Sequence, residues 1–251
     1  MIVDTHTHMG RGERLSDTYQ IDQSVDDLIR GMEEAGVDVS CVMGVAYDDY
    51  EFSNREIHEA VQAHPGRLIG FARANLHREN GLDQIQRCFD EYGFRGVKIH
   101  ATMGDGFPTR GLMELLSQYR WPLLLHTPPN AEAIDAQVHL ARAYPEAPVI
   151  LGHMGAYNAS WPGYTKLCAL EAKRLPNLFL DTAFVTMHHW VRMAVDVCGP
   201  EKLLFGSDAP VMHAAVIRRT IEVAGFTDAE SSLILGGNAR RLLRLDEHTG
   251  L

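Results

Sequence analysis

The chain has 251 residues, of which 45% are hydrophobic and 22% are charged, a composition that is ordinary for a globular protein. Its 33 acidic residues outnumber its 23 lysines and arginines, and the resulting formal net charge of −10 argues against a nucleic-acid partner, because phosphates require a basic surface. No apolar run reaches the roughly 18 residues of a membrane-spanning helix, and no signal peptide is recognisable before the first predicted strand.

Eight short apolar runs, rich in valine, isoleucine and leucine, are predicted as β-strands. They cover residues 2–8, 39–45, 68–75, 96–101, 122–127, 149–155, 178–182 and 203–208. Most are apolar on both faces, which is typical of parallel strands that are covered on both sides.

Helical segments are predicted between these strands and after the last of them, and most end at a glycine or a proline. They cover residues 24–35, 53–64, 82–92, 109–119, 131–143, 161–175, 188–198, 212–224 and 228–243. Ser24 is the expected N-cap of the first helix, with Asp27 in a near capping box. We expect Gly236 and Gly237 to break the last segment into two helices.

Strict alternation of strands and helices predicts a parallel sheet, and eight such units in about 250 residues match the size of a (β/α)8 TIM barrel. A doubly wound open sheet is the alternative, but it favours a Gly-x-Gly-x-x-Gly turn after its first strand. The corresponding stretch, His8-Met9-Gly10-Arg11-Gly12, does not fit this pattern. We therefore predict a single α/β barrel domain over residues 1–251, with an extra C-terminal helix.

Residues that bind metals end several of the predicted strands, and in a barrel these ends form the active site. Side chains alternate along a strand, so Asp4, His6 and His8 are expected to share one face, where two imidazoles can bind one divalent cation. Later strands end in further residues of this kind, namely His126, His153 and Asp208. One such residue is usually a core histidine or a helix cap, but five at one barrel mouth predict a metal site.

The segments around these residues resemble the amidohydrolase superfamily, and specifically the amidohydrolase-2 branch that includes aminocarboxymuconate-semialdehyde decarboxylase. The matching segments are Asp4-Thr5-His6-Thr7-His8, Gly96-Val97-Lys98, Leu125-His126, Gly152-His153-Met154-Gly155, Gly206-Ser207-Asp208 and Gly237-Asn238-Ala239-Arg240-Arg241-Leu242-Leu243. The resemblance implies that three histidines are metal ligands, namely His6, His8 and His126. It also implies that Asp208 is the fourth ligand or a neighbour of the bound water, and that His153 is the acid/base residue.

Neutral imidazoles with a carboxylate suit one divalent metal, with Zn²⁺ preferred over Mn²⁺. Bound Zn²⁺ lowers the pKa of water from 15.7 to about 7. Our first hypothesis is therefore a hydrolase in which metal-bound hydroxide attacks the carbonyl of a small amide, ester or lactone that can carry a carboxylate. The second is a non-oxidative decarboxylase or hydratase of a small unsaturated or aromatic acid. A barrel that binds a ligand without turnover is the third, and the intact ligand set disfavours it.

Other polar residues at the same end leave alternatives open. In binuclear relatives a lysine on the fourth strand is carboxylated and bridges two metals, so Lys98 either takes this role or is buried against a carboxylate such as Asp181. His100, on the same face, is a candidate for lining the substrate pocket. Arg73 is expected either to clamp a substrate carboxylate or to pair with an acidic residue. Further loop arginines considered for the clamp are Arg11, Arg14 and Arg110.

The cysteines and the chain length bear on compartment and assembly. The four cysteines are far apart, form no Cys-x-x-Cys pair and are expected to be buried free thiols of a reducing compartment, which favours a cytoplasmic enzyme. The chain lacks the extra β-domain of many superfamily members, so we expect a neighbouring subunit to complete the pocket, as in a homodimer. The expected partner is a small-molecule substrate, with no nucleic acid and no membrane.

Overall fold

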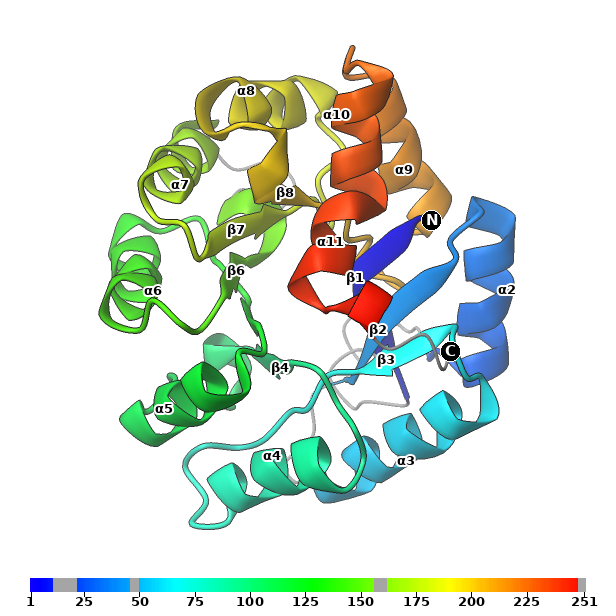
Figure 1. Ribbon diagram of the computed structural model, residues 1–251, viewed down its shortest axis with the longest axis vertical. Helices are drawn as coiled ribbons and strands as arrows, with labels where there is room; N and C mark the ends of the chain where they lie inside the picture. The colour runs from blue at the N-terminus through cyan, green and yellow to red at the C-terminus, as the bar shows by residue number, and fades with distance from the viewer. Residues whose placement is uncertain (11–21, 46–49, 156–161, 248–251) are drawn as a thin grey trace.

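Eight short strands surround the centre of the molecule in the computed structural model, which describes residues 1–10, 22–45, 50–155 and 162–247 (Figure 1). The strands are β1 Val3–Met9, β2 Val39–Gly44, β3 Leu68–Gly70, β4 Val97–Ile99, β5 Leu123–Leu125, β6 Val149–Leu151, β7 Leu178–Asp181 and β8 Leu203–Leu204. Each predicted strand is confirmed, but most end earlier than expected, because their last residues turn into the loops that carry the candidate site.

A helix follows each strand on the outside of the molecule (Figure 1). The helices are α2 Val25–Ala35, α3 Tyr50–Ala63, α4 Gly81–Asp90, α5 Arg110–Tyr119, α6 Ala131–Ala143, α7 Pro162–Arg174, α8 His188–Cys198 and α9 Ala214–Glu222. At the start of α2, Ser24 and Asp27 form the complete capping box that the sequence indicated in part. The helix ends at Gly36, whose φ of 63° suits glycine.

The strands close into a barrel in sequence order. Parallel ladders join the neighbouring strands from β1 through β2 to β3, and those from β4 through β5, β6 and β7 to β8. Between β3 and β4, the Lys98 N–H donates to the carbonyl oxygen of Ala72 at 2.9 Å. Between β8 and β1, the Asp208 N–H donates to the backbone carbonyl oxygen of His6 at 2.8 Å, and the His8 N–H donates to that of Ala209 at 2.7 Å. The predicted TIM barrel is confirmed, because an open sheet would leave two edge strands unpaired.

β1 contains a bulge that changes which side chains face the barrel interior. Asp4 pairs with Ser40 but Thr7 pairs with Val42, so β1 has one residue more than β2 over this stretch. An extra residue interrupts the alternation of faces. Val3 therefore packs inside the barrel, whereas Asp4 faces outward and lines a cavity beside α2 and α9.

The expectation that Asp4 shares a face with His6 and His8 is therefore wrong. A bulge leaves a backbone donor out of the regular ladder, and Asp4 satisfies it by accepting the His6 N–H at 3.1 Å. The same carboxylate oxygen accepts the Ser207 N–H at 2.9 Å. Asp4 thus stabilises the bend in β1 from outside the barrel and ties it to the segment that precedes Asp208.

The C-terminal segment covers the N-terminal end of the barrel, where α11 lies near β1 (Figure 1). It consists of α10 Asp228–Ser232, a π-helical turn Leu233–Gly237 and α11 Asn238–Leu242. Ala239 and Leu243 pack with Val3 in the lower barrel interior. The predicted division into two helices is confirmed, but a π turn that contains Gly236 and Gly237 separates them and the helical path continues through it. A Cβ at Gly236 would lie 2.2 Å from the Met1 carbonyl oxygen, so glycine permits a close approach here.

Asn238 joins this segment to the strand that carries Asp208, and its replacement by alanine is expected to destabilise the fold. Its buried Nδ2 donates to the carbonyl oxygens of Pro200 at 2.8 Å and Leu203 at 2.7 Å. Asn238→Ala leaves both acceptors unsatisfied, so we expect the free energy of unfolding to fall by about 1–3 kcal/mol in urea titrations.

The control is Asn80→Ala, which replaces an exposed N-cap residue whose side chain makes no cap hydrogen bond. This change is expected to stay within about 0.5 kcal/mol of wild type. Equal stabilities of Asn238→Ala and Asn80→Ala would contradict the assigned role of Asn238.

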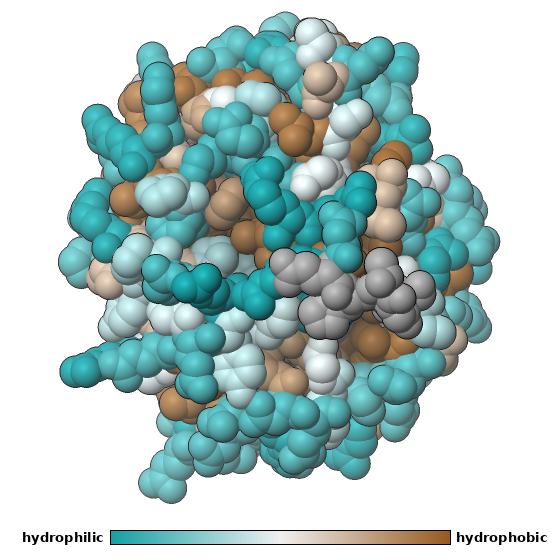
Figure 2. Space-filling model, in the orientation of Figure 1, coloured by the Kyte–Doolittle hydropathy of each residue, from teal (hydrophilic) through white to brown (hydrophobic). Residues whose placement is uncertain are grey.

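All four cysteines are buried and free. No helix in the described part of the chain is both long and apolar enough to span a membrane. Hydrophilic residues cover most of the molecular face shown in Figure 2, with apolar residues visible mainly between the helices.

Candidate metal centre

His6 and His8 of β1 meet Asp208, which follows β8, at the C-terminal end of the barrel. The Oδ1 atom of Asp208 lies 3.4 Å from Nε2 of His6 and 3.3 Å from Nε2 of His8. The three side chains are buried, and their nearest ligand atoms all lie within 4.8 Å of one another. Asp208 has a φ of 71°, a left-handed conformation that is uncommon outside glycine and often found at functional sites.

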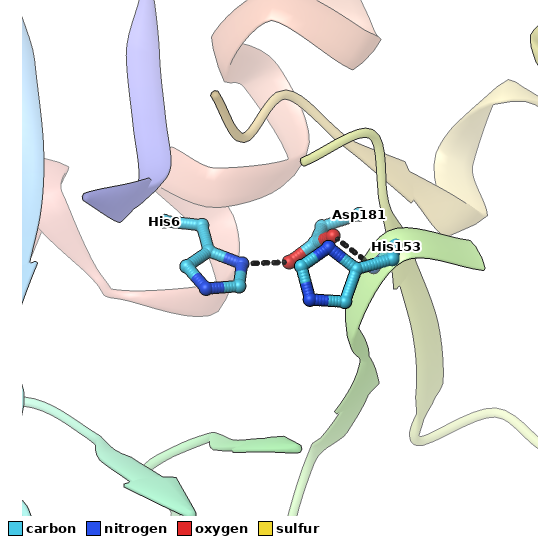
Figure 3. Close-up of side chains that lie close together, drawn as sticks. All are labelled: His6, His153 and Asp181. Carbon is cyan, nitrogen blue, oxygen red and sulfur yellow. Dashed lines mark hydrogen bonds and ion pairs between the residues drawn. The ribbon is translucent and has the colours of Figure 1, made fainter. Parts of the chain in front are cut away.

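Hydrogen bonds on the far side of each imidazole fix which nitrogen faces this cluster. His6 Nδ1 lies 2.8 Å from Oδ2 of Asp181, as Figure 3 shows, and His8 Nδ1 lies 3.3 Å from the carbonyl oxygen of Gly44. A carboxylate and a carbonyl only accept hydrogen bonds, so each Nδ1 carries the proton. Both Nε2 atoms therefore present lone pairs toward Asp208, which is the arrangement that a metal ion requires.

His153 and His126 form the opposite side of the site. His153 Nδ1 donates to the carbonyl oxygen of Ala183 at 2.9 Å, so its Nε2 is an acceptor, and it lies 3.0 Å from Nδ1 of His126. His126 thereby keeps the lone pair on its own Nε2. His153 and Met154 have φ values of 60° and 50°, because β6 ends in a sharp turn that directs the imidazole into the barrel mouth.

Asp181, at the end of β7, connects the imidazole of His6 on β1 with the turn after β6 that carries His153. One oxygen accepts His6 Nδ1, and the other accepts the His153 backbone N–H at 2.7 Å (Figure 3). The sequence analysis considered Asp181 only as a partner of Lys98 and missed this role. The available signal was its position as the last residue of a strand in a barrel whose neighbouring strands end in histidines.

Lys98 points into the site. Its side chain is 1% exposed, and its Nζ lies 2.9 Å from Nε2 of His6. No carboxylate among the described residues lies within ion-pair distance of Nζ, so the expected direct contact with Asp181 is not formed. Burial lowers the pKa of Lys98 to about 8, although Asp208 and Asp181 act in the opposite direction. The metal-bridging role of Lys98 stays a prediction.

Arg73 is fully buried beside the site and already has a counter-ion. Its Nη2 lies 2.7 Å from Oδ2 of Asp105, its Nη1 donates to Gly44 at 3.0 Å, and its guanidinium stacks on the ring of Tyr50 at 4.7 Å. This geometry favours the second alternative, an arginine paired with an acidic residue, over a substrate clamp. Asp105 also accepts the backbone N–H of His100 at 2.8 Å, and the sequence analysis did not single it out.

The other candidates for the substrate pocket differ in position. The half-buried His100 stacks on His126, with ring centroids 3.7 Å apart and an interplanar angle of 11°, so it lies directly beside the candidate ligands. Arg110 is exposed and pairs with Glu114 at 2.7 Å. Arg11 and Arg14 lie outside the described residues.

Burial sets the charges of the cluster. It lowers the pKa of His6, which Lys98 lowers further, and it lowers the pKa of His126 to about 2. Burial alone would raise the pKa of Asp208, but His6 and His8 lower it more, so it falls below its usual range. Neutral imidazoles with an ionised carboxylate form the donor set and the protonation state that Zn²⁺ or Mn²⁺ needs. The residues thus fit a divalent metal, provided that Nζ of Lys98 moves away from His6.

Replacing Asp181 by asparagine is expected to weaken metal binding. Asparagine has one acceptor oxygen where aspartate has two. If that oxygen keeps the backbone N–H groups of His153 and Ala183, the amide NH2 faces His6 Nδ1, and the hydrogen bond that orients His6 is lost. Loss of such a supporting carboxylate typically costs about 10–100-fold in metal affinity. We expect this loss for Asp181→Asn in competition titrations with a chelator.

Asp105→Asn is the matched control, because Asp105 is an equally buried carboxylate that contacts no imidazole ring. It is expected to lower stability more than metal affinity. A metal affinity for Asp181→Asn equal to that of wild type would show that Asp181 does not orient His6.

Comparison of the amino-acid sequence with known protein families identifies the family of this chain. The model of the family described as Amidohydrolase, in its amidohydrolase-2 form, matches residues 3–245. The chain belongs to this family. The amidohydrolase is 24% identical to the γ-resorcylate decarboxylase of Rhizobium radiobacter, in an alignment that covers 77% of this chain and 75% of that protein.

Solved structures share the fold of this amidohydrolase at low identity. A dihydroxybenzoic acid decarboxylase from Polaromonas sp. JS666, with bound manganese and the inhibitor 2-nitroresorcinol, has a TM-score of 0.74 and 19% identity, covering 100% of this chain and 98% of that one. A 4-oxalomesaconate hydratase from Rhodopseudomonas palustris has a TM-score of 0.74 and 20% identity, covering 99% and 98%. The amidohydrolase fold inferred from the sequence is therefore confirmed.

Proposed function

We propose that this amidohydrolase is a metal-dependent, non-oxidative decarboxylase of a small aromatic or unsaturated carboxylic acid. The observation that carries the proposal is its similarity to γ-resorcylate decarboxylase along about three quarters of both chains. The hydrolase hypothesis, which the residues alone ranked first, has less support, because the relatives described above are decarboxylases and a hydratase.

The ligand set proposed for one divalent ion, Zn²⁺ or Mn²⁺, consists of His6, His8, His126 and Asp208. When bound, such an ion acts as a Lewis acid toward oxygen atoms of the substrate. The support is strongest for His6, His8 and Asp208, whose ligand atoms already converge. His126 is included because its Nδ1 bond to His153 leaves its Nε2 as a ligand atom.

His153 is the proposed acid/base residue. In a non-oxidative decarboxylation the bond to the carboxyl carbon breaks, carbon dioxide leaves, and the remaining carbon keeps the electron pair and takes a proton. To supply this proton, His153 must first take one up from solvent at Nε2 and give up the hydrogen bond that it accepts there from Nδ1 of His126, because its own Nδ1 is held by the Ala183 carbonyl. The imidazole becomes neutral in this step and regains its proton from solvent before the next turnover.

The test is turnover by the metal-loaded protein with three groups of compounds: γ-resorcylate and related hydroxybenzoates, unsaturated dicarboxylic acids, and simple lactones and esters. The expected result is release of carbon dioxide from an acid of the first two groups, with solvent deuterium found on the carbon that lost the carboxylate. Addition of water to an unsaturated acid would support a hydratase instead. Hydrolysis of lactones or esters without carbon dioxide release would overturn the proposal.

A further inference from the structure

Two buried cations lie at the catalytic end, and they differ in what surrounds them. Arg73 forms an ion pair with Asp105 and donates to Gly44, so its charge is matched within the protein. Lys98 is equally buried, but within the described residues its Nζ has a single hydrogen-bond partner, the neutral Nε2 of His6. Among the described residues the unmatched charge is therefore the lysine, whereas the sequence had left Arg73 open as either an anion binder or a partner of an acidic residue.

An ammonium group carries three N–H donors, and buried donors are almost always satisfied. Lys98 is 1% exposed, and its Nζ contacts one acceptor among the described residues, which leaves N–H donors for a ligand in the barrel mouth. A buried cation is stabilised far better by an anion than by a neutral group. We propose, on the basis of the decarboxylase function above, that Lys98 binds the carboxylate of the substrate and that Arg73 does not contact it.

The overall charge of the site points to the class of substrate. Asp181 and Asp208 contribute two negative charges, and the Arg73–Asp105 pair is neutral in itself. Counted over the described residues alone, a divalent ion together with Lys98 would leave an excess of one positive charge beside these carboxylates. The outward-facing Asp4 lies on the other side of β1. The site therefore suits a substrate with one carboxylate better than a neutral ester or a dianion.

This assignment links substrate binding to metal binding. Lys98 Nζ occupies the lone pair of His6 Nε2, which is the atom proposed to bind the metal. A carboxylate that draws the ammonium toward itself releases this nitrogen. Such coupling is reciprocal, so a bound carboxylate is expected to increase the affinity for the metal, and the metal to increase the affinity for the carboxylate.

The experiment uses Lys98→Met and Lys98→Gln, with Lys173→Met as a matched control on the exposed face of α7. Metal content and thermal unfolding show that each variant is folded and loaded. Binding of γ-resorcylate and of resorcinol, which lacks the carboxylate, is measured by calorimetry. Both Lys98 variants are expected to bind γ-resorcylate about 10–100-fold more weakly and resorcinol unchanged, because a hydrogen bond to a charged group is lost.

The coupling gives a second measurement that does not depend on turnover. Saturating γ-resorcylate is expected to increase Mn²⁺ affinity in wild type and Lys173→Met but not in the Lys98 variants. Unchanged γ-resorcylate binding in the Lys98 variants would overturn this assignment while leaving the proposed function intact if carbon dioxide is still released. Two metals per chain with a carboxylated Lys98, or no binding of γ-resorcylate by metal-loaded wild type, would also overturn it. A wild type that takes up no metal would instead contradict the proposed function.

Discussion

Replacing His8 by alanine is expected to remove the bound metal from the protein and to abolish turnover. His8 contributes an Nε2 lone pair, and among the described residues its ring contacts the Gly44 carbonyl, Asp208 and the edge of the His6 ring, so its loss removes a ligand with little effect on the fold. Loss of a ligand should cost more than the roughly 10–100-fold in affinity that supporting residues contribute. We expect elemental mass spectrometry to find about one metal ion per wild-type chain and almost none in His8→Ala.

His139→Ala is the control for this experiment, because His139 is an exposed histidine on the outer helix α6. It should retain the wild-type metal content and melting temperature. His126→Ala then decides whether the fourth protein ligand is correctly assigned. Normal metal content in His126→Ala would restrict the site to the three converging side chains, and normal content in His8→Ala would exclude the proposed centre.

Replacing His153 by asparagine is expected to lower kcat by about 10²–10⁴-fold without removing the metal, which is the usual contribution of a positioned general acid or base. Asparagine suits the left-handed conformation at this position, where φ is 60° and most residues would be strained. The variant therefore removes the imidazole but preserves the turn after β6. Steady-state kinetics with the substrate identified in the turnover screen provide the measurement.

Thermal unfolding of His153→Asn should match wild type, since the Asp181 contact is made by the backbone N–H and survives the change. The variant loses the acceptor for Nδ1 of His126, so its metal affinity is expected to fall by about 10–100-fold and its kinetics are measured at saturating metal. A fall in kcat with little change in KM separates a chemical role from a binding role. Wild-type kcat in His153→Asn would exclude this residue as the proton donor.

The barrel could be predicted because local patterns determine most of it. Parallel strands buried on both sides give runs such as Leu123–Leu125, which no other element explains as well, and glycine or proline ends most of the helices. The division of the last helical segment at its two glycines was predictable, but the continuous π turn that joins its halves was not, because it depends on the neighbouring chain. Here the Met1 carbonyl oxygen occupies the space of a side chain.

The candidate site was predictable wherever a histidine or aspartate ends an apolar strand, as at His126, His153 and Asp208. Asp181 also ends an apolar strand, so its presence in the site was predictable, but its contacts with His6 and His153 were not, and Asp105 could not be recognised in this way at all. Asp105 lies in a loop and meets Arg73, 32 residues away, only in the folded chain. The homodimer, the metal identity and the cytoplasmic location stay predictions.

The bend in β1 has a consequence for protein engineering. Transplanting only the His-x-His pair onto a regular strand of another barrel would keep the residue equivalent to Val3 inside but turn both imidazoles toward the surrounding helices, since they are three and five positions further along. A functional graft must also carry the additional residue and the carboxylate of Asp4 that accepts the His6 N–H. The transferable unit is thus the segment from Val3 to His8 together with an N–H donor equivalent to that of Ser207.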